Sequence, residues 1–295
     1  MNACLETSIG TPSRALIAGC GDIGLRVARR LAGSGGEVTA ILRDPQKAAA
    51  LESAGARVRI DDLDTPRDAG DWPWLFWFAP PPATGVADTR LRAWLAAQRG
   101  RIGRLIYVST SGVYGDCGGR WIDEDEPLKP QTDRARRRAD AEAALTQWSA
   151  TTGSAVVVLR VPGIYGPGRL PVERLRQGLP VLCDAEAPYS NRIHADDLAE
   201  AAVRAAARGR AGAAYNLSDG QPTTMADYFR RCAQLLGLPP PPTVHLDEAR
   251  RRFTPAMWSF VEESKRLRID RARRELGYAP RHPDLERGLP SCLPR

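Results

Sequence analysis

Short apolar runs alternate with amphipathic segments along most of this chain. The apolar runs have the length of strands and are rich in β-branched and aromatic residues, at residues 15–18, 37–42, 56–60, 74–78, 104–109 and 155–160. Between them, apolar positions recur at helical spacing in residues 23–33, 45–54, 88–98 and 135–148. Strands that alternate with helices form parallel sheets covered on both faces. The pattern therefore predicts an α/β fold with a doubly wound parallel sheet.

This alternation ends before the C-terminus. Four consecutive prolines at residues 239–242 predict a stiff connector, and roughly the last 50 residues are arginine-rich with a helical pattern. We expect a smaller lobe there that closes over the carboxyl edge of the sheet, where doubly wound folds bind ligands. The predicted division is a sheet domain of residues 14–161 with 187–222, and a lobe of residues 162–186 and 223–295.

A glycine-rich turn links the first predicted strand to the first predicted helix. Gly19 permits a tight turn, Gly21 lets the backbone approach a pyrophosphate, and Gly24 lets the helix pack closely on the strand. The helix then starts around Asp22 and Ile23, where unpaired N–H groups and the positive end of the helix dipole face an anion. Because a strand precedes this turn and a helix follows it, we predict a dinucleotide-binding site.

The end of the second predicted strand indicates which dinucleotide binds. Arg43 provides a guanidinium suited to a 2′-phosphate, which favours NADP(H). Asp44 lies about 20 residues past the glycines, where NAD-binding proteins place an acid, so NAD(H) is the alternative. An aspartate followed by Pro45 at the start of a helical segment is also typical of a helix N-cap. We therefore expect NADP(H).

The composition is that of a globular protein without a membrane anchor. The 295 residues are 43% hydrophobic and 26% charged, and no apolar stretch reaches the ~20 residues of a bilayer span. The N-terminus shows no basic region followed by an apolar one, so no secretory signal is expected. Six scattered cysteines and three histidines lack the spacing of a zinc site. We expect reduced thiols, a cytoplasmic location and no metal.

The formal net charge of +7 is compatible with two kinds of partner. One is an anionic small molecule, and the other is nucleic acid. Basic residues cluster at 134–138, 250–252 and 265–274, but each cluster lies in helix-like sequence with apolar or acidic neighbours. These clusters indicate solvated helix faces, and no nucleic-acid recognition motif accompanies them. We expect a small-molecule substrate rather than DNA or RNA.

Four further motifs follow the glycine turn. The fifth strand leads into Val113-Tyr114-Gly115, and the later motifs occupy residues 123–128, 159–169 and 191–199. Together with the glycine turn, they resemble the extended short-chain dehydrogenase/reductases, the NAD(P)-dependent epimerase/dehydratase superfamily. The resemblance runs from about residue 14 to residue 289. It implies a Rossmann core, a smaller C-terminal substrate domain and a homodimer formed through helices on one side of the sheet.

The sequence departs from this resemblance at the catalytic pair. Active members carry a Ser or Thr, matched here by Thr110, and a Tyr-x-x-x-Lys pair whose positions fall on Arg134 and Arg138. No tyrosine lies between Tyr114 and Tyr165, so a shifted alignment does not restore the pair. An arginine has no acceptor and a pKa above ~12, so it cannot serve as a general base. The departure resembles the atypical branch of the superfamily, whose members keep the dinucleotide fold and often lose the tyrosine.

Several side chains are candidates for a catalytic role. Thr110 is expected to touch the nicotinamide or the substrate, with capping of the strand end as its alternative role. Tyr114 lies near it at the strand end, although family members with the intact pair carry this tyrosine too. Tyr165, His194 and Cys117 are more simply a loop-ordering ring, a structural histidine and a thiol without a neighbouring base. The predicted catalytic residues are therefore Thr110 and Tyr114.

The resemblance also implies where the cofactor lies. Asp62 and Leu63, after the third strand, are expected to flank the adenine. Ala79 and Pro80, after the fourth strand, are expected to line the pyrophosphate and ribose. Pro162, after the sixth strand, is expected beside the nicotinamide.

Four arginines are expected around the ligands. Arg138 is placed to donate hydrogen bonds to the nicotinamide ribose. Arg134, Arg169 and Arg192 are expected near the substrate, where they would favour a phosphate or a carboxylate.

Three functions are compatible with these residues. The first is an NADP(H)-preferring oxidoreductase or epimerase-like enzyme that acts on a small hydroxylated or anionic substrate. The second is an NADP(H)-binding redox sensor or scaffold without chemistry, and the third is a nucleic-acid-binding protein. The sequence favours the first, because hydride transfer needs mainly a cofactor, its geometry and a polarising group.

Overall fold

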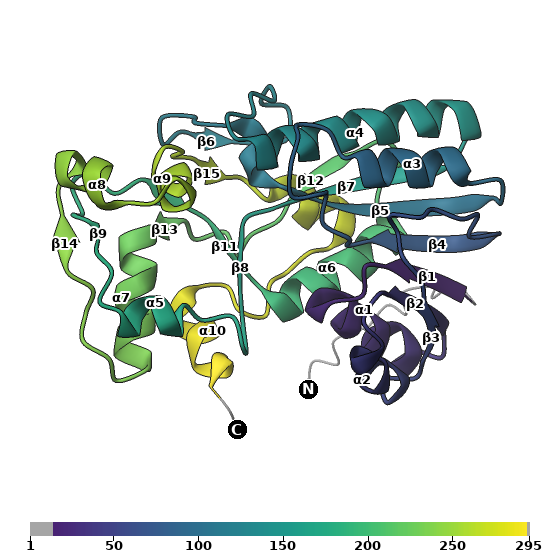
Figure 1. Ribbon diagram of the computed structural model, residues 1–295, viewed down its shortest axis with the longest axis horizontal. Coiled ribbons are helices and arrows are strands. Elements are labelled where there is room, and N and C mark those ends of the chain that lie inside the picture. Colours follow the sequence, from purple (N-terminus) through teal and green to yellow (C-terminus); the bar gives the residue numbers. More distant parts are fainter. Residues whose placement is uncertain (1–13, 294–295) are drawn as a thin grey trace.

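A seven-stranded parallel sheet forms the centre of the computed structural model, which describes residues 14–293 (Figure 1). The strand order is β12-β7-β5-β4-β1-β2-β3, and all neighbours are parallel. The strands are β1 (Arg14–Ala18), β2 (Glu37–Leu42), β3 (Ala56–Ile60), β4 (Trp72–Trp77), β5 (Ile102–Thr110), β7 (Ala155–Val161) and β12 (Ala214–Asn216). The predicted α/β fold and the six predicted strands are confirmed. The seventh strand, β12, has only three residues, too few for an apolar run to mark it.

The strand order reverses between β1 and β4. The chain fills one half of the sheet with β1 to β3, then crosses to the other side of β1 and continues outward from β4. At such a switch point the loops that follow the two strands diverge and leave a crevice at the carboxyl edge. These loops carry Gly19 and Ala79, so two of the predicted cofactor-binding segments lie at this crevice.

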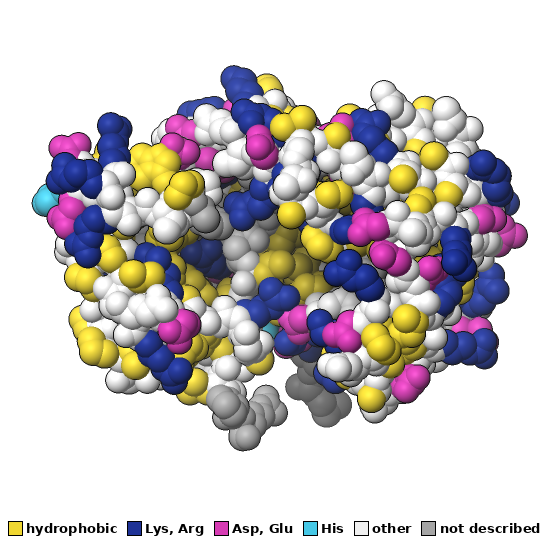
Figure 2. Space-filling model, viewed as in Figure 1, with side chains coloured by type: hydrophobic (Ala, Val, Ile, Leu, Met, Phe, Trp, Pro, Cys, Tyr) yellow, Lys and Arg dark blue, Asp and Glu magenta, His cyan; other side chains and the backbone are white. Residues whose placement is uncertain are grey.

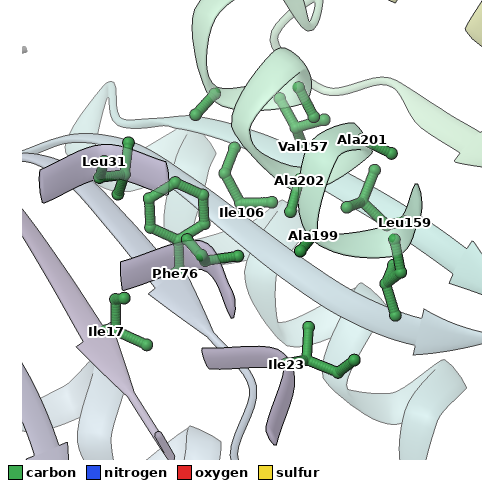
Figure 3. Close-up of a cluster of buried hydrophobic side chains, with 14 of the residues drawn as sticks. Ile17, Ile23, Leu31, Phe76, Ile106, Val157, Leu159, Ala199, Ala201 and Ala202 are labelled. Carbon is green, nitrogen blue, oxygen red and sulfur yellow. The ribbon is translucent and has the colours of Figure 1, made fainter. Parts of the chain in front are cut away.

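Helices cover both faces of the sheet (Figure 1). They are α1 (Asp22–Gly33) and α6 (Ala195–Arg208) on one face, and α3 (Thr89–Ala97) and α4 (Asp133–Thr152) on the other. Arg26 of α1 donates to the carboxylate of Asp196 of α6 at 2.6 Å. Alanines of α6, including Ala199 and Ala202, belong to the same buried cluster as Ile106 of β5 (Figure 3). Their small side chains let α6 approach the sheet and α1 closely.

The helix predicted at residues 45–54 is instead two short pieces. They are η1 (Pro45–Lys47) and α2 (Ala48–Glu52). The carboxylate of Asp44 accepts a hydrogen bond from the N–H of Gln46 at 3.0 Å and caps η1. Asp44 therefore has the N-cap role that its proline neighbour indicates.

A smaller lobe lies beside the carboxyl edge of the sheet. Its elements are α5 (Val172–Arg176), β9 (Val181–Leu182), α7 (Met225–Leu235), β14 (Thr243–Val244), α8 (Leu246–Arg252), α9 (Pro255–Val261), α10 (Leu285–Gly288) and η4 (Leu289–Cys292). Short strand pairs join the lobe and the loops, formed by β6 (Trp121–Ile122) with β15 (Arg266–Leu267), β8 (Gly163–Tyr165) with β11 (Arg192–His194), and β10 (Tyr189–Ser190) with β13 (Thr223–Thr224). The lobe has its own buried cluster, which includes Tyr165, Phe229 and Leu289.

Part of the predicted lobe packs on the sheet domain. The segment around η3 (Ala272–Leu276) contributes Ile269, Leu276 and Tyr278 to the buried cluster of the sheet. Tyr278 also donates from its hydroxyl to the carbonyl of Ser218 at 3.0 Å. These residues lie within the range 223–295 predicted for the lobe, and their apolar side chains are buried in the same cluster as α6.

Two expectations from composition concern membrane spans and cysteines, and the described residues cover only part of each. Within residues 14–293, no helix is both long and apolar enough to span a bilayer. Five described cysteines are unpaired thiols, whereas Cys4 and the predicted absence of a leader lie outside the described residues.

Candidate functional site

The glycine turn has the geometry of a phosphate cradle. Gly19 has a φ of +81°, and a Cβ there would lie 2.4 Å from the backbone nitrogen of Ala79. A Cβ at Gly24 would lie 2.8 Å from the sulfur of Cys20, whereas a Cβ at Gly21 would meet nothing within 4 Å. No side chain caps the N-terminus of α1 at Gly21. An open space in front of uncapped N–H groups fits a pyrophosphate.

Asp22, at the start of α1, is neutralised by two arginines. Its carboxylate accepts from Arg26 at 2.9 Å and from Arg169 at 2.6 Å. Arg169 was predicted to face the substrate. It does line the large cavity described below, but its guanidinium is paired with Asp22 and holds the loop after β8 against α1.

A small cavity of about 170 Å³ lies beside Gly19, at the carboxyl ends of β2 and β3. It brings together six predicted cofactor residues, namely Gly19, Arg43, Asp62, Leu63, Ala79 and Pro80. Asp61 and Arg90 also line it, and sequence reasoning missed both. Arg90 makes two hydrogen bonds to the carboxylate of Asp64, at 2.6 and 2.8 Å, so it is already paired.

A larger cavity of about 580 Å³ lies between the carboxyl edge of the sheet and the smaller lobe. Figure 2 shows this face of the molecule hollowed between its two halves, with Lys and Arg side chains around the hollow. The predicted residues that line the cavity are Pro80, Thr110, Arg134, Arg138, Pro162, Arg169 and Arg192. Arg137, Tyr189, Glu263 and Lys265 also line it. The structure therefore brings most of the predicted nicotinamide and substrate residues to one cavity.

Two of the basic clusters are solvated only in part, because each includes one buried basic residue beside exposed arginines. Arg137 and Lys265 are only 8% and 5% exposed, and both line the large cavity. Lys265 pairs with Glu263 at 2.5 Å. The third cluster, residues 250–252, is exposed as predicted. Helical spacing could not reveal these two residues, because both are covered by segments distant in the chain.

The cavity carries a strong excess of positive charge. Among the described residues, six cations and one carboxylate line it. Arg192 has a buried Nε without a hydrogen-bond partner, and its guanidinium lies 4.2 Å from the centre of the Tyr228 ring. Burial lowers the pKa of Arg192, since its charge has lost water. A bound anion would restore the lost interactions.

Thr110 and Arg138 approach the cavity from β5 and α4. The Oγ1 of Thr110 accepts from the N–H of Gly112 at 3.2 Å, which leaves its hydroxyl proton available. Nη1 of Arg138 donates to the hydroxyl of Tyr107 at 3.0 Å and to the carbonyl of Val108 at 2.9 Å. Arg138 is therefore held against β5, with its other nitrogens left as donors.

Tyr114 is not among the residues that line the cavity, and its predicted catalytic role stays a prediction. Its hydroxyl donates to Asn216 at 2.7 Å and accepts from Arg160 at 2.9 Å, so both of its hydrogen-bonding roles are filled. Burial raises the pKa of this tyrosine. The sequence shows only that Tyr114 follows β5, whereas its orientation depends on partners on β7 and β12.

The alternative candidates also have structural roles. His194 caps α6 by accepting from the N–H of Asp196 at 3.1 Å, and its Nε2 lies 3.1 Å from the hydroxyl of Ser291. Burial lowers the pKa of His194 to about 4. Burial raises the pKa values of the Tyr165 hydroxyl and the Cys117 thiol, and none of these three residues lines either cavity.

Comparison with known proteins agrees with the fold. The NAD dependent epimerase/dehydratase family model matches residues 85–218, and a TrkA-N domain model matches residues 15–67. The chain is 29% identical to a 3-diazoavenalumate denitrifying reductase from Streptomyces, over 94% of this chain and 99% of the relative. It is 31% identical to a dTDP-glucose 4,6-dehydratase from Actinoplanes over 63% of this chain, but spans only 58% of that relative.

Solved structures share the whole architecture. A functionally unknown conserved protein from Silicibacter pomeroyi is 32% identical with a TM-score of 0.77, and the match covers 95% of this chain and 98% of that one. UDP-glucuronic acid 4-epimerase from Bacillus cereus, solved in complex with NAD, matches with a TM-score of 0.76 at 18% identity, over 94% of this chain and 96% of that one. Residues 85–218 of this chain therefore match the NAD dependent epimerase/dehydratase family, and the whole chain has the fold of solved epimerases and dehydratases.

Proposed function

We propose that this protein is an NADP(H)-preferring oxidoreductase that acts on a small anionic or hydroxylated substrate without a Tyr-x-x-x-Lys pair. The observation that carries the proposal is the cationic cavity of about 580 Å³ at the carboxyl ends of β5 and β7. Pro80 lines both this cavity and the smaller one, so a single dinucleotide has room to extend from one to the other. A phosphate or carboxylate on the substrate would then meet Arg134 and Arg192.

The preference for NADP(H) rests on the side chains of the smaller cavity. Two arginines and two aspartates line it. Asp61 and Asp62 can accept hydrogen bonds from the adenine amino group or the ribose hydroxyls. Arg90 is paired with Asp64, whereas Arg43 makes no hydrogen bond or ion pair within the described residues. Arg43 is therefore the guanidinium most available to a 2′-phosphate.

The residues of this chain would orient the substrate and stabilise charge. When bound, the nicotinamide supplies or accepts the hydride. The free hydroxyl proton of Thr110 and the guanidinium of Arg138 would polarise a substrate oxygen. Lys265 lines the same cavity and its ammonium carries three N–H donors, so we assign to it the exchange of the proton with the substrate.

The Streptomyces relative supports a reductase in particular. Its match covers nearly all of both chains, so it includes the cofactor half and the lobe that closes the cavity. We therefore propose that this protein reduces a small substrate, and favour this reaction over epimerisation or dehydration.

Calorimetric titration with NADPH, and separately with NADH, tests the cofactor assignment. We expect NADPH to bind at least about tenfold more tightly, which corresponds to one charge-assisted hydrogen bond. Arg43→Asp should abolish this preference, because a carboxylate repels the 2′-phosphate and accepts ribose hydroxyls. Arg67→Asp is the matched control, since Arg67 is exposed and lines neither cavity. Unchanged relative affinities in Arg43→Asp would contradict the assignment.

A second function, cofactor binding without chemistry, is favoured by the arginines in place of the tyrosine and lysine. Thr110→Val and Thr110→Ser separate the two functions in a screen of small carboxylates and phosphates that follows NADPH oxidation by absorbance. If the protein is an enzyme, Thr110→Val should lower its turnover number by about tenfold or more, and Thr110→Ser should leave it near the wild-type value. The affinity for NADPH should be unchanged in both variants. A protein that binds NADPH tightly but oxidises it with no compound in the screen would favour the sensor.

A further inference from the structure

A cysteine, a glutamate and a histidine meet at one end of the smaller lobe. β9 and β14 pair in parallel, and Cys183 and His245 are the residues that directly follow them. Glu186 lies in the turn that begins at Cys183. These elements, with α8, lie at the left end of Figure 1, and none of the three side chains lines either cavity.

The three ligand atoms form a nearly equilateral triangle. Sγ of Cys183 lies 3.6 Å from Nδ1 of His245 and 3.4 Å from Oε2 of Glu186. Nδ1 of His245 lies 3.5 Å from the same Oε2. In a tetrahedral zinc site, Zn–S is about 2.3 Å and Zn–N and Zn–O about 2.0–2.2 Å, which separates the ligand atoms by roughly 3.3–3.6 Å. The triangle therefore has the size of one face of a zinc tetrahedron.

The backbone holds these side chains in place. The N–H of Cys183 donates to the carbonyl of Val244 at 3.0 Å, which fixes the two strand ends side by side. The N–H of Leu246 donates to Oε2 of Glu186 at 2.7 Å and lowers the pKa of this carboxyl. A carboxylate oxygen has two lone pairs, so Oε2 can accept this hydrogen bond and coordinate a cation at the same time.

We propose that Cys183, Glu186 and His245 bind one Zn²⁺ ion, with water in the fourth position. On binding, the Cys183 thiol releases its proton to solvent, and the thiolate and carboxylate neutralise the divalent charge. A thiolate and an imidazole select Zn²⁺ over Mg²⁺ or Ca²⁺, which prefer oxygen ligands. The ion would join residues 181–186 to residues 243–246 of the lobe. The site is independent of the proposed oxidoreductase activity.

A second group of possible ligands carries no such proposal. His194, Asp197 and His282 also lie close together. However, both nitrogens of His194 have hydrogen-bonding neighbours, and both oxygens of Asp197 accept backbone N–H groups of Arg281 and His282. These atoms are already satisfied by the protein.

Titration with Co²⁺ tests the zinc site spectroscopically. We expect one Co²⁺ per chain, intense visible bands typical of tetrahedral geometry, and a near-ultraviolet thiolate-to-cobalt band, all removed by added Zn²⁺. Cys183→Ser should abolish the thiolate band, and His245→Gln should weaken Co²⁺ binding by about tenfold or more. His282→Gln is the matched control, because it removes a histidine from the other group and should change neither.

Two further readouts keep the test decisive. Zn²⁺ should protect Cys183 from alkylation by iodoacetamide, measured on the Cys183 peptide by mass spectrometry. Melting curves show whether each variant is folded. We expect all of them to fold, because these side chains are half-buried or exposed. Absence of the thiolate band in the folded wild-type protein would overturn the proposal. So would a thiolate band that persists in Cys183→Ser, which would place the metal on another cysteine.

Discussion

Two glycines of the same turn have different physical tasks. Gly19 combines a φ of +81° with a position where a Cβ would overlap the backbone of Ala79. Gly21 has an ordinary backbone conformation and empty space in front of it. Glycine is therefore needed at residue 19 by the protein itself, whereas the protein leaves open space in front of residue 21.

This difference predicts opposite outcomes for two alanine variants. Gly19→Ala should lower the free energy of unfolding by at least about 3 kcal/mol, because β1 or the loop after β4 must move. Gly21→Ala should keep the wild-type stability and lose NADPH affinity, because its methyl group occupies the pyrophosphate space. Urea unfolding and calorimetry measure the two quantities. Equal stability of the two variants would show that the contact with Ala79 relaxes at little cost.

At the scale of elements, helix α4 contacts the sheet through Glu142 and lines the cavity through its arginines. Glu142 of α4 and Arg160 of β7 form a buried ion pair at 2.9 Å, each side chain 9% exposed. Ser109 of β5 donates to the same carboxylate at 2.5 Å, and Arg160 also donates to Tyr114. This network fixes β5, β7 and α4 relative to one another just behind Thr110.

Removing one partner of this pair should be much worse than removing both. Glu142→Ala leaves the Arg160 charge buried and uncompensated, which we expect to cost about 3–5 kcal/mol of folding stability. The double variant Glu142→Leu with Arg160→Met should recover most of that loss, because it buries no unpaired charge. A double-mutant cycle from urea unfolding measures the coupling. Additive losses would show that the two charges act independently.

At the scale of the whole molecule, six cations and one carboxylate among the described residues line the cavity where the lobe meets the sheet. The cations of the cavity come from α4, from the loop after β8, from β11 and from the residue before β15, so folding gathers charges that are distant in sequence. A bound anion would therefore stabilise the contact between the two parts of the molecule.

Sulfate should reveal this effect without knowledge of the substrate. At equal ionic strength, sulfate should raise the Tm above its value in chloride by a few degrees, which corresponds to binding at several times Kd. Arg192→Met should reduce this shift, whereas Arg251→Met, an exposed control outside both cavities, should not. The comparison between variants removes the general stabilising action of sulfate. Equal Tm shifts in the two variants would show that Arg192 does not bind the anion.

Much of the fold, with its glycine turn, follows from local patterns. Strand and helix periods, the glycine spacing and the Asp44-Pro45 cap are set by neighbours within a few residues, so the sequence alone predicts them. The homodimer and the cytoplasmic location stay predictions.

Tertiary structure alone decided the partners of several polar residues. Arg169 pairs with Asp22, and Tyr114 bonds to Asn216, across more than 100 residues of chain. Lys265 and Arg137 are buried for the same reason, and the triangle of Cys183 and His245 exists only because β9 and β14 pair. Hydrogen bonds and burial act through space, so the residue type fixes what a side chain can do, and the folded chain fixes what it meets.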